Sequence, residues 1–169
     1  DVPQTGTLKK TMFSGIALFD PGVLKEFPDK GYCDISKEIY PKLLTDDLPL
    51  FGYVTNKYWV DMGNPQKYLF LQKEILSKKI FQNTVRDVQG TNLQSGFSGS
   101  RVVPPVSIGE NVKIGKDSII GPYISIGNNC IIHNGCILNN SILWDNITIT
   151  ENSKIEKSIV CNQRSIIRT

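Results

Sequence analysis

Asp61 is the first side chain of this sequence that could do chemistry. It stands in the stretch YWVDMGNPQKYL, residues 58–69, after two aromatic residues and before Gly63, Asn64 and Pro65. A carboxylate at the end of a strand, beside a glycine, can hold a divalent cation or a sugar hydroxyl. The alternative is a carboxylate that only caps the following turn, a place where aspartate is common. One carboxylate is not an active site, so other groups must complete it.

The single histidine and the four cysteines are the remaining candidates for chemistry. His133 is the only side chain that could act as the base in acyl transfer, but its place in IIHNGC also suits a surface corner. The cysteines are Cys33, Cys130, Cys136 and Cys161, and they show no C-x-x-C spacing. We therefore expect reduced thiols, with Cys130 and Cys136 buried, and no metal bound by cysteine.

The composition excludes several classes of partner. The chain has 169 residues, of which 40% are hydrophobic and 21% charged, with a net charge of +3. This balance gives no reason to expect nucleic acid or an anionic membrane as a partner. The chain has no run of 18 apolar residues and no signal peptide. We expect a cytoplasmic protein, and because the chain begins with Asp1, we expect a fragment of something longer.

Residues 1–81 mix strand and helix signals. The apolar run MFSGIALF, residues 12–19, predicts a buried strand. Asp20 and Pro21 then predict a short helix through Phe27, as cap and first helical residue. In DISKEIYPKLL, residues 34–44, apolar residues recur at helical spacing after Asp34, and Pro41 is expected to kink or divide that helix.

A hairpin and a second helix are expected next. The runs LFGYV and KYWVD predict two strands joined around residues 55–56. Asn64 and Pro65 then predict a helix with one buried stripe, made of Tyr68, Leu69, Gln72, Ile75 and Leu76. Residues 82–105 are rich in Gly, Ser, Asn and Gln and end in two prolines, so they are interpreted as a linker.

Residues 106–169 repeat with a period of six. The hexads are IGENVK, IGKDSI, IGPYIS, IGNNCI and IHNGCI, and the register shortens once after Leu138. The recurring aliphatic residues are Ile108, Ile114, Ile120, Ile126, Ile132, Leu138, Leu143, Ile149, Ile155, Val160 and Ile166. A fixed period of this kind predicts a parallel β-helix with three flat sides. The aliphatic side chains would stack inside, and the glycines would allow tight corners.

The hexads resemble those of the left-handed β-helix proteins, the hexapeptide-repeat superfamily. Two functional classes use this architecture, acyltransferases and sugar-1-phosphate nucleotidyltransferases. The first half of the chain favours the sugar-1-phosphate nucleotidyltransferases. TMFSGIALFDPGVLKEFP, CDISKEIYPKLL and LPLFGYVTNKYWVDMGNPQKYLFLQKEIL resemble, in this order, the end of a nucleotidyltransferase domain. Mannose-1-phosphate guanylyltransferases are the most similar. The expected fold class is an α+β segment, the end of that α/β domain, followed by an all-β left-handed parallel β-helix.

The resemblance also assigns residues. In the family motif W-x-D-x-G-T-P-x-x-Y the aspartate binds the catalytic magnesium, which implies that Asp61 is a catalytic Mg²⁺ ligand. Asn64 stands here where the family commonly has threonine. The strand that lies along the sugar matches FSGIALF, which implies substrate contacts at Ser14 and Gly15. Their alternative role is a small-residue site where another backbone packs closely.

The resemblance implies an activity for the intact protein. It would join a sugar 1-phosphate to a nucleoside triphosphate, giving an NDP-sugar, such as GDP-mannose, and pyrophosphate. The family's glycine-rich phosphate loop and its sugar-phosphate lysine do not occur in this sequence, so the chain alone is expected to be inactive. Two alternatives stay open, a β-helix acetyltransferase and a non-catalytic assembly or regulatory module.

The β-helix is expected to mediate a homo-oligomer. Its repeats place apolar residues outward, among them Ile119, Ile131, Ile137 and Trp144. The sequence also ends in SIIRT without an amphipathic helix that could cap the stack. Trp59 and Trp144 are interpreted as packing residues rather than ligand platforms.

Overall fold

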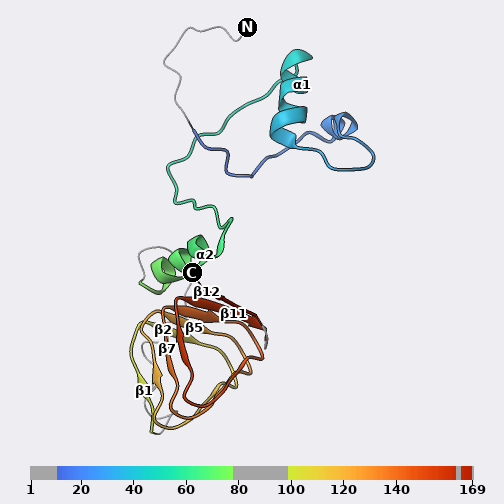
Figure 1. Cartoon of the computed structure of the whole chain (residues 1–169). Helices are drawn as coiled ribbons and strands as arrows, with labels where there is room; N and C mark the ends of the chain where they lie inside the picture. The colour runs from blue at the N-terminus through green and yellow to red at the C-terminus, as the bar shows by residue number, and fades with distance from the viewer. Residues whose placement is uncertain (1–10, 78–98, 163–164, 169) are drawn as a thin grey trace. The chain divides into compact units, whose positions relative to one another are not determined.

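A computed structural model describes residues 11–77, 99–162 and 165–168 (Figure 1). Its contacts divide the chain into two units, residues 1–59 and residues 60–169, which are described separately below. The sequence-based boundaries at residues 81 and 105 stay a prediction, and most of the expected linker lies outside the described residues. Within the described part, no helix is both long and apolar enough to span a bilayer.

The helices of the first unit begin where the sequence predicts. A 3₁₀ helix, η1, spans Pro21–Glu26, and the Asp20 carboxylate accepts a hydrogen bond from the Gly22 amide at 2.8 Å. A carboxylate at this position satisfies an amide that has no partner within the helix. The predicted short helix with an Asp20 cap is therefore confirmed.

Pro41 changes the type of the next helix. A π-helix, η2, spans Ile35–Ile39, and an α-helix, α1, continues it over Tyr40–Thr45. Asp34 caps the pair by accepting from the Ser36 amide at 3.0 Å. Proline has no N–H and cannot take an interior position in a regular helical ladder, so the geometry changes beside it. The predicted division at this proline is confirmed.

The strands predicted in this unit are wrong for the described residues. Residues 12–19 and 51–61 form no strand. Leu18 is fully exposed, and Phe51 and Tyr53 are about nine-tenths exposed. A strand satisfies its backbone groups through a neighbouring strand, and residues 11–59 supply none. The apolar pattern marks segments suited to a sheet, but the described part of this unit contains no sheet for them to join.

A small set of side chains packs the first unit together. Ile39 and Leu43 are almost fully buried in the helix pair. The rings of Phe13 and Tyr40 meet edge to face at 5.7 Å, and Lys42 pairs with Glu26 at 2.7 Å. This core is small beside the exposed apolar surface around it.

The second unit is a β-helix of parallel strands preceded by α2, Pro65–Leu76. The strands form three sheets, with the orders β1-β4-β7-β10, β12-β11-β8-β5-β2 and β3-β6-β9. Their bounds are β1 Arg101–Val102, β2 Val106–Ile108, β3 Lys113–Ile114, β4 Ile119–Ile120, β5 Ile124–Ile126, β6 Ile131–Ile132, β7 Ile137–Asn139, β8 Ser141–Leu143, β9 Thr148–Ile149, β10 Lys154–Glu156, β11 Ser158–Asn162 and β12 Ser165–Arg168. The expected fold class, an α+β segment followed by a left-handed parallel β-helix, is confirmed.

The strand register follows the repeat. Ile119 pairs with Arg101 in the preceding turn and with Ile137 in the following turn, so each of these turns spans three hexads. Ile137 then pairs with Lys154, which lies one residue short of the same interval. One residue is lost between Leu138 and Leu143, which is where the sequence predicts that the register shortens.

The interior of the β-helix contains the predicted aliphatic stack. Ile120 and Leu138 are fully buried, and Ile132 and Leu143 nearly so. Burying such a side chain contributes roughly 1.5–3 kcal/mol, so the stack is the main source of stability in this unit.

The two cysteines of the β-helix interior are buried, as predicted. The Cys130 thiol donates to the carbonyl oxygen of Trp144 at 3.1 Å, and the Cys136 thiol donates to that of Thr150, also at 3.1 Å. Burial raises the pKa of the Cys130 thiol, which keeps it protonated as a hydrogen-bond donor.

Three of the four repeat glycines act differently from the prediction, while Gly121, with φ of 104°, takes the conformation predicted for a tight corner. Gly109, Gly115 and Gly127 are not in the left-handed region. A Cβ on Gly109 would lie 2.7 Å from the carbonyl carbon of Gly127 in the next turn. These glycines are therefore needed because successive turns lie so close together. Asparagine or aspartate takes the left-handed conformation at most corners, namely at Asn111, Asp117, Asn129, Asn140, Asn146 and Asn152.

The C-terminal edge is covered by a strand. β12 pairs antiparallel with β11, with Ile159 opposite Ile167. The expectation of an uncovered end is wrong for this sheet, because an antiparallel strand satisfies the outer backbone groups of β11 without any helix.

Helix α2 packs its predicted stripe against the β-helix. Asn64 caps the helix by accepting from the Lys67 amide at 2.9 Å, and Pro65 is the first helical residue. Gln72 and Leu76 are buried, and the Gln72 amide donates to the Ser125 hydroxyl at 3.0 Å. Figure 1 shows α2 beside the sheet that contains β2, β5 and β11.

Candidate functional site

Asp61 lies in the turn that leads into α2 and is paired with a lysine. Its Oδ2 lies 2.8 Å from Nζ of Lys67, in the first turn of the helix. A Cβ on Gly63 would lie 3.0 Å from the same carboxylate oxygen. Glycine at this position therefore lets the carboxylate fold back over the turn toward the helix.

The carboxylate of Asp61 is ionised and accessible. The hydrogen bond and the charge of Lys67 hold the pKa of Asp61 below its usual range, and the Gly63 backbone amide lowers it further. Both side chains are about half exposed. An exposed, charged oxygen can act as one ligand of a hard cation.

The two predicted substrate residues lie in the other unit. Ser14 accepts a hydrogen bond through its carbonyl oxygen from the indole N–H of Trp59, at 3.1 Å. Gly15 has φ of 80°, and a Cβ there would meet nothing within 4 Å. Within the described part of the chain, no other backbone packs closely against this residue, which is what the alternative role would require. Glycine is required for the backbone conformation, and the space above it is open.

Trp59 has a role that the sequence interpretation missed. The sequence predicts only packing for this residue, but its indole N–H joins the segment before Asp61 to the segment that carries Ser14. The sequence could have indicated this role, because Trp59 lies two residues before Asp61 and its indole N–H can donate a hydrogen bond to a backbone carbonyl.

The described residues do not by themselves assemble a metal centre. Among residues 11–77, 99–162 and 165–168, no group of three or more His, Cys, Asp or Glu side chains could hold an ion. Asp61 offers one ligand, so further ligands would have to come from a substrate, from water or from other residues.

His133 lies at an exposed corner of the β-helix, after β6. Its amide donates to the carbonyl oxygen of Ile149 at 3.0 Å, and its own carbonyl oxygen accepts from the Ser118 hydroxyl at 3.1 Å. These backbone contacts are those of a corner residue in the stack.

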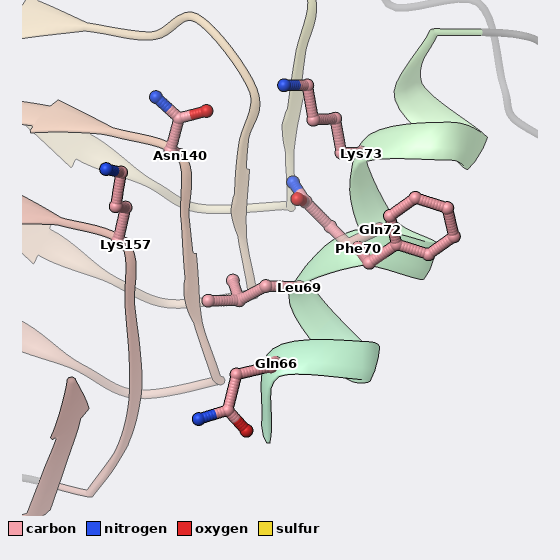
Figure 2. A pocket seen from close by; sticks show the side chains of 7 residues that line it. All are labelled: Gln66, Leu69, Phe70, Gln72, Lys73, Asn140 and Lys157. Atoms are coloured by element: carbon pink, nitrogen blue, oxygen red, sulfur yellow. The ribbon is translucent and has the colours of Figure 1, made fainter. Parts of the chain in front are cut away.

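A groove lies between α2 and one corner of the β-helix (Figure 2). Leu69 and Phe70 of the helix form its apolar part, while Asn140 and Lys157 come from successive turns of the β-helix. Lys73 also lines it, and its ammonium lies 4.8 Å from the centre of the Tyr123 ring. This cation–π contact helps to hold the helix against the β-helix.

Comparison with known proteins identifies similar sequences. Residues 102–169 match the family described as GMPPB C-terminal domain. A UTP–glucose-1-phosphate uridylyltransferase from Synechocystis sp. is 25% identical over 103 residues, which are 57% of this chain and 26% of that protein. A mannose-1-phosphate guanylyltransferase from Mycobacterium tuberculosis is 33% identical over 57 residues, 33% of this chain and 16% of that protein. The matched part is thus about a quarter or less of each relative.

Proposed function

We propose that this chain, which resembles the C-terminal portion of sugar-1-phosphate nucleotidyltransferases, completes the active site of such an enzyme. The enzyme would join a sugar 1-phosphate to a nucleoside triphosphate and release pyrophosphate. The observation that carries the proposal is the hydrogen bond from Trp59 to Ser14. It links the segment assigned to the sugar with Trp59, which lies two residues before Asp61 in the sequence.

The apolar segments of the first unit that form no strand support a role as part of a larger domain. Residues 12–19 and 51–59 expose large apolar side chains and form no strand. An exposed apolar surface of this kind normally packs against another element. The remainder of an α/β nucleotidyltransferase domain would supply the sheet that these segments lack.

GDP-mannose is the proposed product. The name of the 33% identical relative, mannose-1-phosphate guanylyltransferase, favours mannose 1-phosphate and a guanine nucleotide as substrates. The 25% identical relative acts on glucose 1-phosphate and UTP, and these form the competing substrate pair.

Magnesium is the proposed cofactor, with Asp61 as one ligand. Both substrates are polyanions, so a hard cation would screen their charges and stabilise the charge that develops at the reacting phosphate. Magnesium commonly takes one or two carboxylates and fills its remaining positions with water and phosphate oxygens. A single ionised carboxylate fits that pattern. Asp61 would hold the cation, and the cation would screen the charges of the two substrates.

Ser14 and Gly15 are proposed to contact the sugar through their backbone. The missing side chain at Gly15 leaves open space beside the chain. A pyranose ring could lie there and exchange hydrogen bonds with backbone groups. The Ser14 carbonyl, held by Trp59, would be kept in a fixed direction.

The 169-residue chain is proposed to be inactive alone, because its described residues offer one candidate carboxylate and no phosphate-binding loop. The test compares the chain with the intact protein by pyrophosphorolysis of GDP-mannose and UDP-glucose. We expect activity only in the intact protein, and a faster reaction with GDP-mannose. Activity of the chain alone would overturn this part of the proposal, and a preference for UDP-glucose would overturn the choice of product.

An oligomer through the β-helix is also proposed. Ile119 and Ile137 pair as neighbours on β4 and β7, and both side chains are more than a third exposed. Light scattering on the chain should show a dimer or a dimer of dimers. Ile137→Lys should reduce the mass to that of a monomer, and an unchanged mass would exclude this face.

A further inference from the structure

We propose that Lys67 is a positioning residue that competes with the divalent cation for the carboxylate of Asp61. This inference rests on the proposed function, since it takes Asp61 as a cation ligand. Lys67 would hold the carboxylate in place when the cation is absent and would leave it when the cation binds.

The backbone near Lys67 is fixed before its side chain makes any contact. Its amide donates to the Asn64 side chain at 2.9 Å, and Pro65 opens the helix. The lysine side chain therefore starts from a defined place in the first turn of α2. From there it reaches back across the turn, and its Nζ lies 2.8 Å from Oδ2 of Asp61.

The ammonium and a bound cation cannot share this oxygen easily. Magnesium binds carboxylate oxygen at about 2.0–2.1 Å. A dication at that distance from Oδ2 would lie close to the ammonium, and like charges repel at such separations. A cation bound through Oδ2 therefore requires the ion pair to open, and a cation bound through Oδ1 is still repelled by the nearby ammonium. In this way Lys67 raises the cation concentration that the site needs, until substrate phosphates contribute further ligands.

Stability of the fold does not require this pair. Asn64 already caps the helix, and both charged side chains are about half exposed to water. Exposed ion pairs contribute little to folding stability. Because the ion pair is weak, Lys67 competes only weakly with the cation for Asp61. Removing the lysine side chain should therefore tighten cation binding by about two- to fivefold.

The test uses Mn²⁺ as a probe and the 169-residue chain labelled with ¹⁵N. Mn²⁺ broadens amide signals near its binding site, so the Gly63 amide reports binding at Asp61 without any measurement of activity. Lys67→Met should lower the Mn²⁺ concentration for half-maximal broadening by about two- to fivefold. Lys67→Arg keeps the charge and should behave like the unchanged chain.

Two further variants separate the possible failures. Lys73 lies on the same helix as Lys67, but its ammonium contacts the Tyr123 ring and not Asp61. Lys73→Met should therefore leave the Mn²⁺ titration unchanged. Asp61→Asn should abolish the broadening at Gly63. Lys67→Met could give the same Mn²⁺ titration as the unchanged chain while Asp61→Asn still abolishes the broadening at Gly63. In that case the proposal that Lys67 competes with the cation is wrong, and the assignment of Asp61 as a cation ligand still holds. If Asp61→Asn has no effect, or no broadening occurs at Gly63 in any variant, both are wrong.

Discussion

The indole N–H of Trp59 donates a hydrogen bond to the carbonyl oxygen of Ser14 at 3.1 Å, across 45 residues of sequence. This contact joins the segment that carries the proposed sugar residues to the segment that contains Trp59, which lies two residues before Asp61 in the sequence. Neither segment forms a strand in the described residues, so the indole is a specific link between them. It explains why a tryptophan, with a donor on an apolar ring, suits this position.

Trp59→Phe should weaken sugar binding more than it weakens the fold. The change removes the donor and keeps the ring, and a single hydrogen bond contributes about 0.5–1.5 kcal/mol. In the intact protein we expect KM for the sugar 1-phosphate to rise several-fold, with a smaller change in kcat. Steady-state kinetics measure both. Trp144→Phe, on an exposed corner of the β-helix, is the matched control and should change neither. Equal effects of the two variants would argue against a positioning role.

Leu138→Ala and Ile137→Ala should differ sharply although the residues are adjacent. Leu138 is fully buried in the stack, whereas Ile137 is 38% exposed on the outer face of β7. Truncating a buried leucine costs about 2–5 kcal/mol, since a cavity remains. The exposed isoleucine should cost less than about 1 kcal/mol in a monomeric sample. Urea unfolding measures both free energies, and similar losses would show that the interior has been assigned to the wrong residues.

Gly127→Ala tests the close approach of successive turns. A Cβ at this position would lie 2.7 Å from the carbonyl carbon of Trp144 and from the amide nitrogen of Asp145. Such overpacking should destabilise the β-helix by about 1–3 kcal/mol. Gly52→Ala, where a Cβ would meet nothing within 4 Å, is the control for the same substitution. Thermal unfolding should show a lower Tm for the first variant only. An unchanged Tm in Gly127→Ala would contradict the spacing of the turns.

The ion pair between Glu26 and Lys42 predicts a direction of pH dependence. The hydrogen bond and charge of Lys42 lower the pKa of Glu26 below its usual 4.5. A carboxyl group whose pKa is lowered by folding stabilises the folded state above its unfolded pKa. That contribution is lost as the pH falls through the lower, folded value. Carboxyl NMR should show the Glu26 pKa rising toward 4.5 in Lys42→Met, and no shift would mean that the pair does not form in solution.

Much of the β-helix could be predicted from the sequence because its rules are local and repeated. A period of six fixes which side chains face inward, and its two shortenings, from Leu138 to Leu143 and from Ile155 to Val160, are visible as shifts of that period. The role of the glycines is not visible in the same way. Gly109 is constrained by Gly127, one full turn further along the chain, and only the three-dimensional structure shows how closely two turns approach.

The first unit was harder to predict because a strand depends on distant partners. The pattern of residues 12–19 is that of a buried strand, but the described residues of the unit contain no sheet. The candidate site shows the same limit. Asp61 and Lys67 lie further apart in sequence than the usual helical spacing of side-chain pairs. Their contact depends on a turn at Gly63 that folds the carboxylate back toward the helix.

The most direct test of the account is Asp61→Asn in the intact protein, measured by pyrophosphorolysis of GDP-mannose with Mg²⁺ varied to saturation. The substitution keeps the shape of the side chain and removes its charge. If Asp61 holds the catalytic cation, kcat should fall by about two orders of magnitude or more, while the unfolding midpoint stays close to that of the unchanged protein. A kcat near that of the unchanged protein at saturating Mg²⁺ would contradict the account, because the carboxylate would then only cap the turn before α2.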